Sequence, residues 1–202
     1  MKVFDFDKTI YRRDSSTDFY FFCLGRHPRL IFGIFGQIGG FLKYFLKKAT
    51  LTEAKEKFFS YVSKLPDPEK EAELFWESHF HGIYGWYFKE KGPDDVVISA
   101  SPDLILRPIC EKLGVKKLIC TRMDPKTGKI TGENNRGAEK TRRFREELAG
   151  AEIEAFYSDS IADKPMADMA KTAFLIKKGN VLPWNDTDFS KSQHLWERIF
   201  GR

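Results

Sequence analysis

The chain has 202 residues, of which 42% are hydrophobic and 31% are charged, and its net charge is +5. This length supports one well-packed core with a smaller accessory lobe, and the composition excludes a disordered chain. The positive charge suits phosphate-bearing partners or an anionic membrane surface, although a solvated basic face is the simpler explanation.

The chain begins with a short buried strand, predicted over residues 2–6. One carboxylate, Asp5, lies within this strand and a second, Asp7, follows it directly. Side chains two residues apart on a strand point the same way. Asp5 and Asp7 should therefore project together where the strand ends, with Phe4 and Phe6 turned toward the core. Two like charges this close repel each other unless a cation lies between them. The pattern indicates a metal ion or a reaction at this point.

From about Asp14 to Gly92 the sequence has helical periodicity, as in the run TEAKEKFFSYVSKL. Thr52 is the expected N-terminal cap of that helix, with Lys55 in place of the acidic third residue of a complete capping box. The stretch as a whole predicts an all-helical segment inserted after the first strand.

Beyond KGPDD, short apolar runs alternate with helical stretches. The runs VVISA, KLICTRM, IEAFYS and TAFLIK are predicted strands, and helices are expected at 102–113, 138–149 and 164–170. This alternation is typical of a parallel sheet with right-handed crossovers. The segment DPKTGKI predicts a hairpin turn that forms a small excursion from the sheet.

The predicted fold class is α/β. Residues 1–14 and 92–202 form a Rossmann-like parallel-sheet core, and residues 15–91 form the inserted all-helical cap domain. In open parallel sheets, binding sites form at the carboxyl ends of the strands.

Several polar side chains should meet at that edge of the sheet. They are Asp5, Asp7 and Thr9 after the first strand, Ser99 and Ser101 after the second, Lys140 in the opening turn of a helix, and Asp159 and Asp163 after IEAFYS. Carboxylate oxygens suit a hard ion such as Mg2+. Hydroxyl, amide and ammonium groups suit phosphoryl oxygens.

The order of these motifs resembles that of the haloacid dehalogenase superfamily of phosphotransferases. The shared order is Asp-x-Asp-x-Thr, a strand that ends in Ser, a Lys, and an acidic pair after a strand. The helical insertion and the segment YSDSIADKP are similar to the phosphoserine-phosphatase-like branch, which has a helical (C1-type) cap. The four motifs span the predicted core from end to end.

The resemblance implies a role for each motif. Asp5 would be the nucleophile that forms an aspartyl-phosphate, and Asp7 would give a proton to the leaving alcohol and later take one from water. Mg2+ would be held by Asp5, by the backbone carbonyl of Asp7 and by Asp159. Ser99 and Lys140 would bind phosphoryl oxygens.

Three further residues have supporting roles under the same resemblance. Thr9 would shape the loop after the strand by hydrogen bonding to backbone. Asp163 would hold Lys140 or a metal-bound water, or would only cap a helix. Ser101 would bind phosphate or cap a helix, since Pro102 follows it.

The second aspartate bears on the reaction, because haloalkanoate-cleaving members of the superfamily lack it. The resemblance therefore implies a Mg2+-dependent phosphomonoester hydrolase acting on a small soluble substrate. Phosphoserine itself is disfavoured, because the cap has no arginine between Arg29 and Arg107 and the flap YRRDSSTDFY is basic where an amine-binding acid is expected. Asp14 or Asp18 would have to substitute for that acid. Arg12 and Arg13 would contact an acidic leaving group or would be ordinary exposed charges.

Residues 30–42 are apolar except for Gln37, and three lysines follow them. The segment is too short and too rich in glycine for a membrane-spanning helix. The favoured interpretation is a cap helix buried against its neighbours. The alternative is a surface that contacts lipid, with lysines facing anionic headgroups. These lysines are Lys43, Lys47 and Lys48.

Two alternative functions therefore stay open. The chain is also similar to the bacterial phosphatidylglycerophosphate phosphatases of the same branch, which makes a lipid phosphate a candidate substrate. A non-catalytic peripheral membrane-binding protein is the other alternative. A nucleic-acid partner is not expected, because EKTRRFREEL interleaves basic with acidic residues.

Three cysteines without metal-ligand spacing suit a reducing compartment, so a cytoplasmic protein is expected, with peripheral membrane contact as the alternative.

Overall fold

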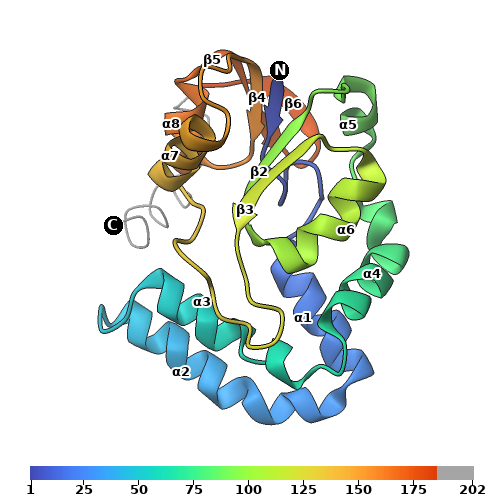
Figure 1. Ribbon diagram of the computed structural model, residues 1–202, viewed down its shortest axis with the longest axis vertical. Coiled ribbons are helices and arrows are strands. Elements are labelled where there is room, and N and C mark those ends of the chain that lie inside the picture. Colours follow the sequence, from blue (N-terminus) through green and yellow to red (C-terminus); the bar gives the residue numbers. More distant parts are fainter. Residues whose placement is uncertain (186–202) are drawn as a thin grey trace.

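The computed structural model describes residues 1–185, and a six-stranded sheet lies at the centre of the fold (Figure 1). The strand order is β3-β2-β1-β4-β5-β6; the first five strands are parallel, and β6 pairs antiparallel with β5. The strands are β1 (Lys2–Phe4), β2 (Val96–Pro102), β3 (Lys117–Thr121), β4 (Ile153–Ser158), β5 (Ala170–Lys177) and β6 (Asn180–Pro183). The predicted α/β class with a parallel-sheet core is confirmed.

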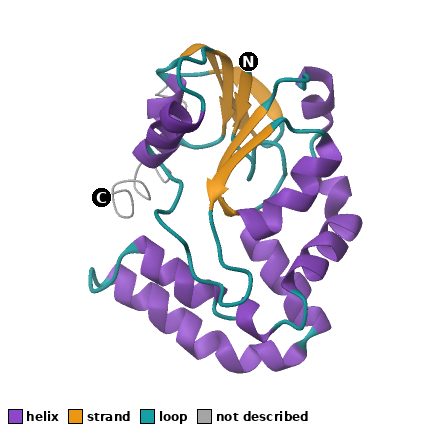
Figure 2. Cartoon of the chain, viewed as in Figure 1, coloured by secondary structure: helices purple, strands orange, loops and turns teal. Residues whose placement is uncertain are grey.

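The described residues form eight α-helices, and five of them follow β1 before the chain returns to form β2. Some of the helices lie beside the sheet and others extend away from it (Figure 2). They are α1 (Ser15–Arg26), α2 (Ile34–Phe45), α3 (Leu51–Phe59), α4 (Pro68–His79), α5 (Gly85–Glu90), α6 (Asp103–Leu113), α7 (Ala138–Glu147) and α8 (Lys164–Ala167). The helix predicted over 164–170 is shorter than expected, because β5 already begins at Ala170.

Each face of the sheet has its own hydrophobic cluster. Val3, Ile98 and Phe156 pack on one face with Phe144 of α7 and Met166 of α8. Residues of α1, α4, α5 and α6 pack on the other face, against alternating side chains of the same strands. Alternation of side chains along a strand buries both faces, as expected for a parallel sheet between two layers of helices.

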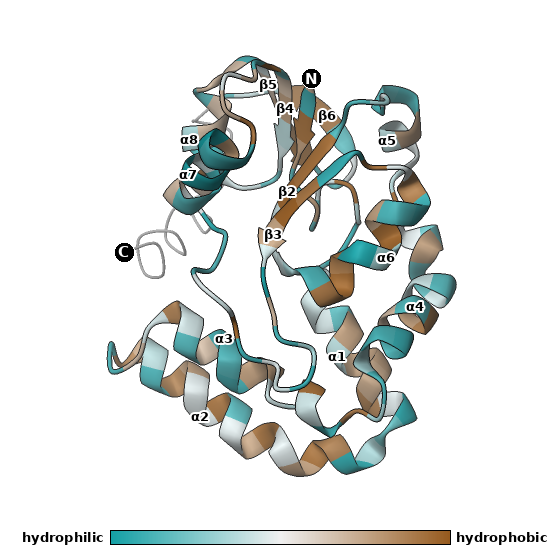
Figure 3. Cartoon of the chain, viewed as in Figure 1, coloured by the Kyte–Doolittle hydropathy of each residue, from teal (hydrophilic) through white to brown (hydrophobic). Residues whose placement is uncertain are grey.

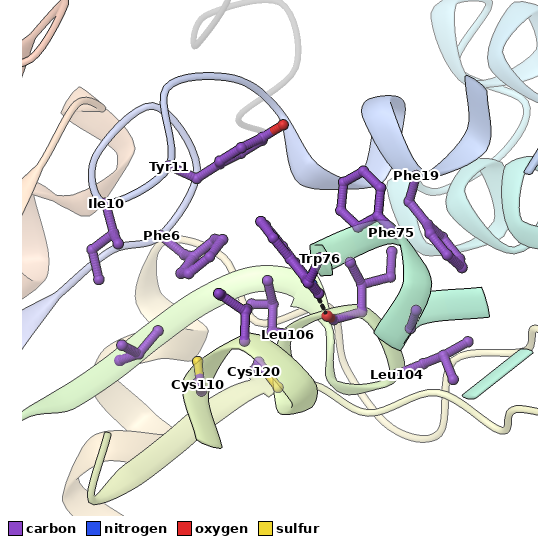
Figure 4. Close-up of a cluster of buried hydrophobic side chains, with 14 of the residues drawn as sticks. Phe6, Ile10, Tyr11, Phe19, Phe75, Trp76, Leu104, Leu106, Cys110 and Cys120 are labelled. Carbon is purple, nitrogen blue, oxygen red and sulfur yellow. Dashed lines mark hydrogen bonds between the residues drawn. The ribbon is translucent and has the colours of Figure 1, made fainter. Parts of the chain in front are cut away.

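Aromatic side chains join the inserted helices to the sheet (Figure 4). Trp76 of α4 contacts the rings of Phe6 and Tyr11, and its indole nitrogen donates to the backbone carbonyl of Ile105 at 2.6 Å. Phe19 of α1 belongs to the same buried cluster. The insertion therefore shares its core with the sheet through α1 and α4. The division at residues 14/15 and 91/92 into core and cap stays a prediction.

Helices α2 and α3 pack against each other and form an arm that extends away from the sheet (Figure 1). The N-terminal cap of α3 is Thr50, which forms a complete capping box with Glu53. The prediction of Thr52 as the cap was wrong, because the helix begins two residues earlier than its apolar periodicity indicates. The prediction that α2 is buried against its neighbours was also wrong for one side of the helix, since Phe35, Ile38 and several neighbours are exposed.

The segment predicted as a hairpin turn packs on this arm and not beside the sheet. Met123 and Ile130 form an antiparallel bridge that closes the turn, and the amide of Ile130 donates to Glu56 of α3 at 3.1 Å. Gly128 has a φ of 71°, and a β-carbon there would lie 2.2 Å from the carbonyl oxygen of Phe59. The turn therefore requires glycine both for its conformation and for its close contact with α3.

Candidate active site

A cavity of about 290 Å³ opens at the carboxyl ends of β1, β2 and β4. It is lined by Asp5, Asp7, Ser99, Lys140, Asp159 and Asp163, among others. These six residues come from four separate parts of the chain, and the structure brings them together in one cavity. The edge of the sheet produces the convergence, since every parallel strand ends there.

The turn after β1 brings its two aspartates to the same cavity. The predicted strand over 2–6 is too long: β1 ends at Phe4, although the amide of Asp5 still donates to Tyr157 of β4 at 2.8 Å. The carbonyl of Phe6 then accepts the amides of the three residues 9–11, which closes a tight turn. Lys8 within it has a φ of 57°.

Lys140 joins two buried carboxylates. Its ammonium donates to Asp5 Oδ1 at 2.8 Å and to Asp163 Oδ2 at 2.7 Å, and the lysine is only 2% exposed. Burial alone lowers the pKa of Lys140, but the charges of Asp163 and Asp5 raise it well above its usual range, so the ammonium stays charged. Ser158 also donates to Asp163 Oδ2 at 2.7 Å. The ammonium of Lys140 therefore bridges Asp5 and Asp163.

Two donors fix the carboxyl group of Asp7. The backbone amide of Ser15 donates to Oδ1 at 2.8 Å, and the hydroxyl of Ser101 donates to Oδ2 at 2.5 Å. Burial first, and then the nearby charge of Asp14, raise the pKa of Asp7 to about 7. The N-terminus of α1 therefore orients this side chain against β2.

Thr9 and Ser101 contact the aspartates and do not line the cavity themselves. The amide of Thr9 donates to the Phe6 carbonyl, as expected for a residue that shapes the turn, and its hydroxyl also donates to Asp5 Oδ2 at 3.4 Å. The hydroxyl of Ser101 is directed to Asp7, and no Ser101 contact caps α6, since Pro102 holds the cap position without a side-chain hydrogen bond. A phosphate contact for Ser101 stays a prediction.

Arg12 and Arg13 lie outside this cavity. They line an adjoining cavity of about 570 Å³, in which Arg12 donates to the carbonyl of His81 at 2.7 Å and Arg13 pairs with Asp18 at 2.9 Å. Lys8 and Asp159 line both cavities. The two arginines therefore stand near the mouth of the site, and substrate contact by them stays a prediction.

Sequence reasoning missed Lys55, which reaches the cavity from α3. Its ammonium donates to the carbonyl of Ala100 at 2.9 Å and to Asn134 Oδ1 at 2.7 Å. Burial lowers its pKa to about 8, although Asp14 opposes that shift. A lysine on a helix has no sequence signal that separates it from a solvated one, so only the placement of α3 reveals it.

Asn135 is a second residue that the sequence did not single out. It is fully buried, and its amide nitrogen donates to the carbonyls of Ser99 and Ile119 at 3.0 and 2.9 Å. These two bonds hold the ends of β2 and β3 together beside the cavity. In the sequence this residue lies in ENNRG, a composition that indicates only a turn.

The donor set of the cavity fits a hard divalent cation. Among residues 1–185 no three His, Cys, Asp or Glu side chains are grouped to share a metal ion, so a metal there would need a backbone oxygen in addition to two carboxylates. Asp5 and Asp159 supply those carboxylates. Burial, followed by the charge of Asp5, raises the pKa of Asp159. A cation between these two residues would relieve both effects, and an all-oxygen set is what Mg2+ prefers.

Comparisons with known proteins agree with this fold and motif order. The model of the haloacid dehalogenase-like hydrolase family matches residues 3–168. The protein CicA of Caulobacter vibrioides is 30% identical over 185 residues, a match that covers 83% of this chain and 82% of CicA. A probable phosphatase of Mycobacterium tuberculosis is 36% identical over 122 residues, which cover 54% of this chain and 42% of that protein.

Solved structures share the fold at lower identity. A Bordetella pertussis protein of unknown function has a TM-score of 0.68 at 20% identity, with 86% of this chain and 87% of that chain covered. A phosphoserine phosphohydrolase-like protein of Francisella tularensis has a TM-score of 0.53 at 16% identity, with 86% of each chain covered. With a family match over residues 3–168 and a relative that aligns along most of its length, the chain belongs to the haloacid dehalogenase-like hydrolase family.

Proposed function

We propose that this hydrolase is a Mg2+-dependent phosphomonoester phosphatase that works through an aspartyl-phosphate on Asp5. The observation that carries the proposal is the arrangement in one cavity of Asp5, Asp7 and the buried Lys140. Such an arrangement supplies a nucleophile, a proton carrier and a fixed positive charge for a phosphoryl group. Membership in a hydrolase family argues against the alternative of a non-catalytic membrane-binding protein.

Mg2+ would be held by the carboxylates of Asp5 and Asp159 and by the backbone carbonyl of Asp7. When bound, it would neutralise charge between the phosphate and the anionic nucleophile. The same charge balance explains why two buried carboxylates can share this cavity.

The chain's own residues then divide the reaction into two displacements. A carboxylate oxygen of Asp5 attacks phosphorus, the bond to the leaving oxygen breaks, and Asp7 gives that oxygen its proton. Lys140 and Ser99 donate hydrogen bonds to the phosphoryl oxygens during transfer. In the second displacement Asp7 takes a proton from water, which attacks the phosphorus and frees Asp5 as a carboxylate. Ser15 and Ser101 hold Asp7 in the orientation that both steps need.

The test is phosphate release from a panel of phosphomonoesters, with and without Mg2+. The panel contains phosphoserine, sugar phosphates, nucleotides, and phosphatidylglycerophosphate in detergent micelles. We expect turnover of at least one compound, loss of that turnover in excess EDTA, and recovery when Mg2+ is restored. Folded protein that releases no phosphate from any of them, or that is unaffected by EDTA, would contradict the proposal.

A small soluble phosphomonoester is the substrate class we favour, and Lys55 is the residue we propose for contact beyond the phosphate. Its ammonium has three donors, and the contacts with Ala100 and Asn134 use two. A third donor can therefore meet an acidic group of the substrate. This role would replace the cap arginine that the phosphoserine phosphatases use.

Replacing Lys55 with methionine is expected to raise KM about tenfold while kcat changes little, because the contact is made equally in the ground and transition states. Its pKa of about 8 adds a pH signature. As the pH rises from 7 to 9, Lys55 loses its charge, so the KM of the unmodified protein should rise while that of Lys55→Met stays level. Steady-state kinetics at both pH values measure this, with Lys57→Met, an exposed lysine on the same helix, as control. Equal effects of the two substitutions would refute the role.

A lipid phosphate is a second candidate substrate, and an apolar groove near the site favours it. An apolar groove of about 370 Å³ lies between α1, α2 and α3 and includes Thr17. Thr17 also lines the adjoining cavity with the two arginines, and that cavity meets the catalytic cavity at Lys8, Asp14 and Asp159. The lipid proposal therefore places the acyl chain in this groove and the phosphate near Asp5. The micellar substrate in the panel separates this candidate from the soluble ones.

A further inference from the structure

Helix α2 has its polarity reversed relative to an ordinary surface helix. Its buried residues are Gln37 and Gly40, whereas several large apolar side chains are exposed. Apolar residues recur along the helix (Figure 3). Phe32 in the preceding turn and Phe35 are 81% and 82% exposed. We define the apolar face by its exposed residues: Ile31, Phe32, Phe35, Ile38, Leu42, Phe45 and Leu46. A contiguous patch of this kind marks an interaction surface.

The inward side of α2 is packed against α3, and these contacts fix which side of the helix faces outward. The amide of Gln37 donates to the carbonyl of Phe58 at 3.1 Å, and Phe41 contacts the ring of Phe58. A β-carbon at Gly40 would lie 2.6 Å from the β-carbon of Lys57, so the two helices touch there. Rotating α2 to bury its phenylalanines would break these contacts.

The segment that carries the apolar face has charge of one sign. Residues 19–52 contain no aspartate or glutamate. The exposed cations of this segment include Arg29, Lys47 and Lys48, which flank the face residues in the sequence, and Lys43, which lies among them. A row of cations beside inserted apolar side chains complements a surface that is anionic outside and apolar beneath.

We propose that the apolar face of α2 docks on an anionic lipid bilayer, with its phenylalanines in the interface and its lysines against the headgroups. A second copy of the chain fits less well, because a symmetric dimer through this face would bring like-charged lysines together. Spanning is excluded for α2, since its 12 residues reach only about 18 Å. No helix among the described residues has the length and hydrophobicity to cross a membrane.

The docked orientation has a consequence for the rest of the molecule. The apolar groove between α1, α2 and α3 is lined by Ile38, Leu42 and Phe45 of the same face. It would therefore open toward the acyl region. The inference goes beyond the proposed function and does not depend on it, because docking would occur with a soluble or a lipid substrate.

Flotation with vesicles tests the proposal. Vesicles of 30% phosphatidylglycerol and 70% phosphatidylcholine should carry the full chain upward at low salt, pure phosphatidylcholine vesicles should carry at least about tenfold less, and added salt should weaken the binding. The double substitution Phe32→Ser and Phe35→Ser should reduce binding at least about tenfold. Phe88→Ser on α5, at a phenylalanine that is 46% exposed outside the face, is the matched control and should bind normally.

Three outcomes would overturn the proposal. The first is no binding to the anionic vesicles at low salt, and the second is undiminished binding of the double variant. The third is a dimer that sedimentation detects in the absence of lipid and that the double substitution dissociates. The last would assign the face to a second copy. Hydrolysis of a soluble phosphomonoester is measured in parallel, and we expect all variants to keep it. Absence of hydrolysis in every protein, with binding as expected, would count against the proposed function alone.

Discussion

Replacing Asp5 with asparagine is expected to lower phosphate release on the order of 10⁴-fold, because the carboxylate that attacks phosphorus is lost. Asparagine has almost the same shape, and Lys140 keeps its contact with Asp163 at 2.7 Å. The fold should therefore remain intact. Initial rates on the best substrate of the panel, at saturating Mg2+, measure the effect.

The control for this prediction is the same chemical change at Asp168, an exposed aspartate that pairs with Lys164 on the surface. Asp168→Asn should keep full activity. Borohydride reduction during turnover converts an acyl phosphate to homoserine, so mass spectrometry should find homoserine at position 5 of the unmodified protein. Turnover of Asp5→Asn within tenfold of normal, or homoserine at position 7, would remove Asp5 from the role of nucleophile.

The sheet and the convergence of the site residues could be predicted because both depend on local patterns. Apolar runs of strand length alternate with helical periodicity, and parallel strands must end at one edge. The carboxylates at positions 5, 7 and 159 each lie at the end of a predicted strand or just after it, so their approach needed no knowledge of side-chain packing. The length of β1 was harder to predict from the sequence, because the turn that ends the strand depends on three amides that donate to the Phe6 carbonyl.

The site residues that the sequence did not reveal are placed by contacts between distant segments of the chain. Lys55 enters the cavity only because the turn at Gly128 and the bond from Ile130 to Glu56 hold α3 near the sheet. Neither contact has a local sequence signal. The exposure of α2 has the same origin: apolar periodicity defines a helical face, but it does not say whether protein or another phase covers that face.

Replacing Lys140 with methionine is expected to have the second large effect, and on two quantities at once. The substitution removes the fixed positive charge that faces the phosphoryl group, which should lower kcat on the order of 10³-fold. The carboxylates of Asp5 and Asp163 also lose the ammonium that lies 2.8 and 2.7 Å from them. Uncompensated buried charge should lower the free energy of unfolding by about 3–5 kcal/mol. Denaturant unfolding and steady-state kinetics measure the two effects separately.

A double substitution separates stability from catalysis. Adding Asp163→Asn to Lys140→Met removes one of the two uncompensated carboxylates, so the double variant should be more stable than Lys140→Met alone. It should be no more active, because the charge that meets the phosphoryl oxygens is still missing. Lys171→Met, which breaks an exposed pair with Glu152, should change the unfolding free energy by less than about 0.5 kcal/mol. If activity returned together with stability, Lys140 would be a residue that only holds the fold, and the positive charge for transfer would have to come from elsewhere in the cavity.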